Sequence, residues 1–190
     1  MIRPSLTLRV ICSGLALTLA LAAQAVQQRF EQAGRLQSSD GERAAFLHVG
    51  CSPDSDGGAL VIELVATEAN KRKDFDYDDF EGPDAAAAKR ALSHLDWIAA
   101  AGKTEITHVA AGWYAPETPE SFIFGVNQLS HRSGPVANLL AAIGTSGGRF
   151  VWMQTGFDDP KRQLVANFDL DVNAAQHLHD TVAACLSKSN

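Results

Sequence analysis

Residues 144–148 read Gly-Thr-Ser-Gly-Gly and match the G-x-S-x-G string that surrounds the nucleophilic serine of many hydrolases. In such enzymes the serine stands on a sharp turn from a strand into a helix, where backbone N–H groups can stabilise an oxyanion. Here an apolar helical pattern precedes Ser146 and a strand pattern follows it, so the order of elements is reversed. The string therefore predicts a glycine-rich turn, and we assign no catalytic residue.

The acidic run at residues 74–81 is a second candidate site, because clustered carboxylates attract hard cations and basic proteins. Asp74, Asp76 and Asp78 have the spacing of the first ligands of an EF-hand loop, but Asp79 replaces its glycine and Ala85 its glutamate. The run favours a solvated acidic face, with a docking surface for a basic partner as the functional alternative. Its candidate partner-binding residues are Asp74, Asp76, Tyr77, Asp78, Asp79 and Glu81.

Trp113 and Tyr114 complete the candidate partner-binding set. They lie in a connection that glycine and proline flank, and aromatic side chains in loops are frequent anchors of recognition surfaces. Packing against the core is the structural alternative, and the pattern favours it because a chain of this size has few large residues.

The six histidines do not predict a metal site. A zinc pair on a helix needs a spacing of three or four residues, whereas His177 and His179 have a spacing of two. His48 and His108 each lie in a predicted strand, and no carboxylate or second histidine stands two residues from either; the other two histidines are His94 and His131. We therefore expect no metal and no cofactor.

Residues 1–25 have the three parts of a secretory signal peptide: a start with two arginines, an apolar centre at residues 10–23 and an A-x-A cleavage site that ends at Ala25. A membrane anchor is the competing interpretation, but the apolar run is short and ends in small residues rather than in a basic cluster. We expect cleavage after Ala25 and a periplasmic or secreted protein without a stable membrane anchor.

Cleavage removes Cys12 and leaves Cys51 and Cys185 in an oxidising compartment, where a disulfide is the expected state and two free thiols are the alternative. Such a bond closes a loop of more than a hundred residues. In the chain-entropy model it stabilises the fold by about 4–5 kcal/mol.

Charge and length limit the class of protein. Cleavage leaves 14 basic side chains against 22 acidic ones, a net charge of −8, which argues against nucleic-acid binding. The charge favours solubility as its role, with a cationic partner as the functional alternative. The remaining 165 residues are enough for one domain with a sizeable core, which we place at residues 44–190. Residues 26–43 are polar and predict an N-terminal arm or a short helix.

Period-2 alternation predicts several strands, and short connections join them into hairpins. The predicted strands are residues 44–51, 59–67, 103–110, 121–127, 149–155 and 163–170; residues 70–81 fit a solvated strand or a loop. Helical spacing predicts helices at residues 85–100, from Gly134-Pro135 onward, and from an N-cap at Asn173 to Cys185. The fold class is α+β: an antiparallel sheet with two or three helices packed on one face and one disulfide.

The end of the chain resembles known small exported bacterial proteins. The residues that carry the resemblance are Val165-Ala166-Asn167-Phe168-Asp169-Leu170, then Ala174-Ala175 and Cys185. This pattern is similar to the tail of the invasion-associated locus B family and of periplasmic accessory proteins linked to type VI secretion. The chain departs from it at Val172-Asn173, where a glycine is expected. The resemblance implies a non-catalytic envelope or secreted domain with a disulfide, and it carries over no catalytic residue.

These features together favour an exported, non-enzymatic protein that binds an envelope component or another exported protein. One alternative is an acidic inhibitor or immunity protein against a basic cell-wall-degrading enzyme, which would use the acidic run. A small hydrolase is the other alternative.

Overall fold

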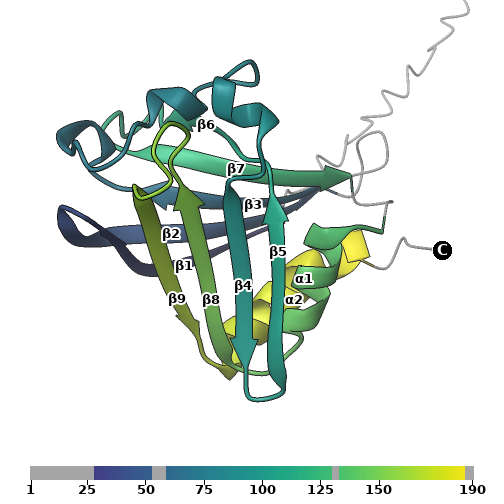
Figure 1. The fold of residues 1–190 in the computed structure, drawn as a ribbon. Coiled ribbons are helices and arrows are strands. Elements are labelled where there is room, and N and C mark those ends of the chain that lie inside the picture. The colour runs from purple at the N-terminus through teal and green to yellow at the C-terminus, as the bar shows by residue number, and fades with distance from the viewer. Residues whose placement is uncertain (1–27, 53–58, 130–132, 187–190) are drawn as a thin grey trace, which may run out of the picture.

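The computed structural model describes residues 28–52, 59–129 and 133–186, and these residues form a curved antiparallel half-barrel (Figure 1). Its nine strands follow the order β5-β4-β8-β9-β1-β2-β3-β7-β6. The strands are β1 (Gln28–Ser38), β2 (Gly41–Ser52), β3 (Ala59–Ala66), β4 (Ser93–Ala99), β5 (Gly102–His108), β6 (Ala111–Tyr114), β7 (Phe122–Leu129), β8 (Gly148–Thr155) and β9 (Gln163–Leu170). Two α-helices, α1 (Pro135–Ile143) and α2 (Val172–Leu186), and three short 3-10 helices complete the described part.

The sheet bends at the junction of β1 with β9, so that β4, β5, β8 and β9 run steeply across β1, β2, β3 and β7 (Figure 1). Only Arg35–Gln37 of β1 pairs with β9, opposite Val165–Asn167. Gly34 permits the close approach at this bend, because a Cβ atom there would lie 2.3 Å from the Phe168 ring. A unit of four strands (β5, β4, β8 and β9) and a unit of five (β1, β2, β3, β7 and β6) are thereby joined through a short seam.

The concave side of the sheet holds the core. Alternate residues of the strands point into it, as in β9, where Leu164, Ala166 and Phe168 are fully buried. Both helices add an apolar stripe, and α2 packs mainly on β1 and β2. The largest fully buried side chains include Trp97 and Trp152. Side chains therefore fill the interior that the described strands enclose.

Cys51 at the end of β2 and Cys185 in the last turn of α2 form a disulfide, with 5.9 Å between their Cα atoms. The bond joins residues that are 134 positions apart. It confirms the expected pairing and fixes α2 against the concave side of the sheet.

The expected antiparallel sheet is confirmed, but the sheet takes up more of the chain than an α+β fold with two or three helices suggests. The predicted hairpin of β8 with β9 and the pairing of β2 with β3 are both present. The helix predicted from Gly134-Pro135 is α1, and the strand before it is β7. The pattern analysis missed the four-residue strand β6.

Residues 28–38 are neither a free arm nor a short helix: they form β1, near the centre of the sheet. Phe30 and Leu36 point inward and are buried. The two inward positions between them are Gln32 and Gly34, which interrupt the apolar alternation. The polar composition of the segment therefore concealed a central strand.

The helix predicted at residues 85–100 is also wrong, because this segment forms a 3-10 turn, Ala86–Lys89, followed by strand β4. Leu95 and Trp97 point inward and are buried, whereas His94 and Asp96 lie on the convex side. Leu95 follows Leu92 by three residues, which fits a helix, and precedes Trp97 by two, which fits a strand. Pairing with β5 and β8 stabilises the strand.

The predicted N-cap of α2 is shifted by two residues. The carboxylate of Asp171, rather than Asn173, accepts a hydrogen bond of 2.8 Å from the backbone N–H of Ala174. The helix thus starts at Val172, directly after the last strand.

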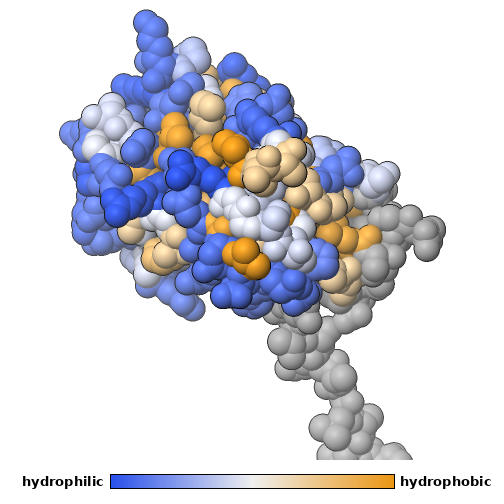
Figure 2. Space-filling view, turned by 90° about the horizontal axis from the view of Figure 1, so that it is seen from below, coloured by the Kyte–Doolittle hydropathy of each residue, from blue (hydrophilic) through white to orange (hydrophobic). Residues whose placement is uncertain are grey.

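Most of the surface seen from below is hydrophilic, and apolar residues reach it in separate patches (Figure 2). Neither described α-helix has the length and apolar character that a membrane crossing requires. The predicted signal peptide at residues 1–25 lies outside the described residues.

Candidate functional site

The acidic run folds as turns around an aromatic cluster rather than as a strand. Two 3-10 helices, Ala69–Lys71 and Asp78–Phe80, flank a loop. Phe75 and Tyr77 of this loop and Phe80 of the second 3-10 helix point inward and are buried. Their rings pack against Phe122 and Phe124 of β7, with centroid distances between 5.2 and 5.9 Å. This cluster fixes the acidic side chains between the aromatic ones at one end of the half-barrel.

Asp74 and Tyr77 are not available to a partner, because both are buried. The side chains of Arg43 and Asp74 are 2% and 0% exposed, and they form an ion pair of 2.9 Å. A second Arg43 nitrogen donates a hydrogen bond to the Tyr77 hydroxyl oxygen. Burial raises the pKa of Tyr77, so this hydroxyl stays neutral. Asp74 and Tyr77, which were predicted to bind a partner, instead hold the acidic run against β2 through Arg43.

Asp76 and Asp79 meet the β8–β9 turn, which lies beside the 3-10 helices at the upper end of the molecule in Figure 1. A cleft of about 290 Å³ separates the two segments, and Arg162 supplies its one basic side chain. We call the carboxylates that line this cleft, together with Asp78 beside them, the acidic rim: Asp76, Asp78, Asp79, Asp158 and Asp159. Glu81, the last predicted residue of the run, does not line the cleft.

The pKa of Asp79 is raised above its ordinary value by burial and, in part, by the other rim carboxylates. Burial raises its pKa, and the charges of Asp76, Asp158 and Asp78 raise it further. The ion pairs formed between described residues include none of the rim carboxylates. The rim is therefore a concentration of negative charge that described basic side chains leave unpaired.

The two aromatic candidates lie on opposite sides of β6. The Tyr114 hydroxyl donates a hydrogen bond of 2.9 Å to Asp78. Burial, together with this hydrogen bond and the charge of Asp78, raises the pKa of Tyr114 to about 12. Trp113 is 38% exposed on the convex side, where its ring lies over Gly125 of β7. Tyr114 thus belongs with the acidic rim, and Trp113 does not.

Replacing Asp79 with asparagine should stabilise the protein at neutral pH. A raised pKa means that ionised Asp79 opposes folding, so we expect Asp79→Asn to raise the melting temperature at pH 7 by up to a few degrees. The difference should shrink as the pH falls through the raised pKa, and it should vanish below 3.8, where the carboxyl is protonated in both states.

Thermal unfolding followed by circular dichroism at a series of pH values measures this effect. Asp180→Asn, an exposed change on α2, is the control and should leave the melting temperature nearly unchanged. Equal melting temperatures of Asp79→Asn and the parent at pH 7 would show that rim repulsion is not significant.

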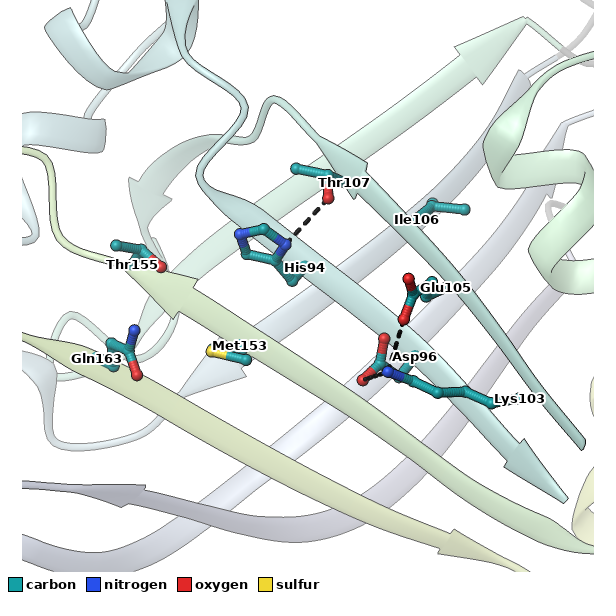
Figure 3. A pocket seen from close by; sticks show the side chains of 9 residues that line it. All are labelled: His94, Asp96, Lys103, Glu105, Ile106, Thr107, Met153, Thr155 and Gln163. Carbon is teal, nitrogen blue, oxygen red and sulfur yellow. Dashed lines mark hydrogen bonds and ion pairs between the residues drawn. The ribbon is translucent and has the colours of Figure 1, made fainter. Parts of the chain in front are cut away.

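A shallow depression on the convex side brings together other polar groups (Figure 3). The side chains that line this depression come from β4, β5, β8 and β9. His94 shares a hydrogen bond of 3.0 Å with Thr107, directly opposite it on β5, and Lys103 lies between Asp96 and Glu105. The carboxylates of this depression, Asp96 and Glu105, pair with Lys103 rather than with His94, so the His94–Thr107 pair is best explained as a cross-strand contact.

The remaining sequence candidates do not form a catalytic or metal site in the described part of the chain. Ser146 lies exposed in the turn between α1 and β8, which confirms the turn from a helix into a strand. No group of three or more His, Cys, Asp or Glu side chains in the described residues could hold a metal ion. His131 lies outside the described residues.

Sequence reasoning did not connect Asp158 and Asp159 with the rim. Both were part of a predicted turn before the last strand, and nothing in the local sequence places that turn beside residues 76–79. Comparison of the chain with protein-family models, with curated proteins and with solved structures finds no match.

Proposed function

We propose that the chain is an exported, non-enzymatic binding protein that docks on a basic surface of another protein of the cell envelope through its acidic rim. The observation that carries this proposal is the meeting of the Asp76–Asp79 turn with Asp158 and Asp159 across one cleft. Besides burial, the charges of Asp76, Asp78 and Asp158 raise the pKa of Asp79, so these like charges oppose folding. Binding sites often retain such unfavourable charge.

The rest of the molecule supports a role in surface recognition. Buried apolar side chains from the strands and both helices pack together on the concave side, which therefore serves as the core. The disulfide and the signal-like sequence of residues 1–25 favour an oxidising compartment such as the periplasm. Buried aromatic anchors hold the rim in place, and a pre-organised surface loses little entropy on binding.

Capture of basic proteins from envelope extracts tests this role. The processed protein should capture a partner with a basic surface, and the affinity should fall at least about tenfold between low and high salt because exposed charges are screened. The rim variant Asp76→Asn/Asp79→Asn/Asp158→Asn should bind the same purified partner at least about tenfold more weakly.

The control variant Glu105→Gln/Asp169→Asn/Asp180→Asn removes the same number of charges outside the rim. It should bind the partner as the parent does. A partner whose affinity is independent of salt, or equal losses in the two triple variants, would contradict the proposal.

The rim would also suit an inhibitor or immunity protein against a basic cell-wall-degrading enzyme. In that case the captured partner cleaves peptidoglycan, and the parent protein slows the clearing of a peptidoglycan suspension while the rim variant does not. Full enzyme activity in the presence of saturating parent protein would exclude this version and leave the binding role itself in place.

A further inference from the structure

The convex side of the sheet carries an apolar row where a solvent-facing surface is usually polar. Trp113, Ile123, Val65, Phe46 and Ala33 lie directly opposite one another on five neighbouring strands. All five point away from the core, since their strand neighbours Leu47, Leu64 and Phe124 point into it. The row therefore lies on the convex side, with Trp113 38% exposed at one end and Val65 only 7% exposed at the centre.

A groove crosses this row at Val65 and Ile123, with a volume of about 490 Å³. The loop at residues 115–118 forms one wall, in which Pro116 presents an apolar ring. Charged side chains of β1 and β2 form the opposite wall. The lining consists of Arg29, Glu31, His48, Val65, Ala115, Pro116, Glu117, Thr118 and Ile123. The groove shares no lining residue with the acidic rim.

The charges beside the groove leave an excess of carboxylates. Arg29 is paired with Glu63 at 3.3 Å, which neutralises the one arginine. Glu31 lies 3.1 Å from His48, and Glu117 forms no ion pair among the described residues. An apolar floor between two carboxylates is complementary to an apolar side chain with basic neighbours.

We propose that this groove binds an extended segment of a partner protein in which aliphatic side chains alternate with lysine or arginine. An extended chain points alternate side chains to opposite sides, so the aliphatic ones can contact Val65 and Ile123 together. The basic side chains between them point away from the floor, and their long, flexible chains can bend back to the carboxylates of Glu31 and Glu117 on the two walls. This surface is independent of the acidic rim, and each can be tested alone.

Short fluorescent peptides of alternating leucine and lysine provide the probe, and fluorescence anisotropy with the processed chain measures their affinity. Peptides of alternating serine and lysine, or of leucine and glutamate, should bind at least about tenfold more weakly. Ile123→Thr, which keeps a β-branched residue in the strand, should weaken the leucine–lysine peptide about tenfold. Glu117→Lys should weaken it about fivefold without a change in the core.

Ile98→Thr is the matched control, because Ile98 is 42% exposed on the convex side of β4, outside the groove. It should change the affinity by less than about twofold, and the rim variant should behave likewise. Equal binding of the three peptides, or full affinity in both Ile123→Thr and Glu117→Lys, would overturn the proposal. So would a concentration-dependent dimer that Ile123→Thr abolishes, since a second copy would then occupy the groove.

Discussion

Removal of the disulfide is expected to cost about 4–5 kcal/mol of unfolding free energy in the chain-entropy model. The bond joins residues 134 positions apart, so it restricts the unfolded chain over most of the described sequence. Cys51 and Cys185 are 1% and 0% exposed, and we therefore choose Cys51→Ala/Cys185→Ala, which leaves no buried thiol or hydroxyl. In a domain of this size the melting temperature should fall by about 10–15 °C.

Urea unfolding and thermal unfolding of the parent and the double variant measure this loss. The parent in a strong reducing agent should become about as unstable as the variant, because both lose the same constraint. Equal stability of the oxidised parent and the double variant would show that the link between β2 and α2 contributes little. The two single variants should each lose as much as the double variant, since either removes the bond.

Loss of the buried carboxylate at Asp74 is the second large effect. Asp74→Asn leaves Arg43 charged and without its ion-pair partner among buried side chains, which typically costs about 3–5 kcal/mol. The exposed change Asp76→Asn in the same loop is the matched control and should cost little. Urea unfolding of the two variants at pH 7 measures the difference, and equal stabilities would contradict the anchoring role of the pair.

The pH dependence of stability provides a second readout for this pair. Burial by itself raises the pKa of Asp74, but hydrogen bonds from Ser38 and Arg43 and the charge of Arg43 outweigh it and lower the pKa below 3.8. The stabilisation is therefore complete above the unfolded-state pKa and is lost as the pH falls through the lower folded-state value. The apolar double variant Arg43→Met/Asp74→Leu should regain most of the stability and lack this acid loss.

Strands with an unbroken alternation were accessible to sequence reasoning. In β9 every second residue from Leu164 to Leu170 is apolar and buried, and a short turn joins this strand to β8. The disulfide could also be predicted, because only two cysteines follow the signal-like segment. Helix α1 was recognisable from Pro135 at its start and from its apolar stripe.

The other elements depend on contacts that no local pattern records. Gln32 and Gly34 face inward in β1, and only the tertiary structure shows that Gly34 makes room for Phe168. The apolar residues of strand β4 also fit the spacing of a helix, and hydrogen-bonded pairing with β5 and β8 makes the segment a strand. The acidic run was noticed in the sequence, but the burial of Asp74 and the approach of Asp158 follow from the packing of distant segments.

Chemical cross-linking tests the docking role of the acidic rim most directly. A carbodiimide joins carboxylates to lysines that already touch, and mass spectrometry of the cross-linked protein from the cells that produce it identifies both residues. We predict bonds from Asp76, Asp79 or Asp158 to lysines of another envelope protein. Bonds formed only by carboxylates outside the rim, such as Asp169 and Asp180, would contradict the account.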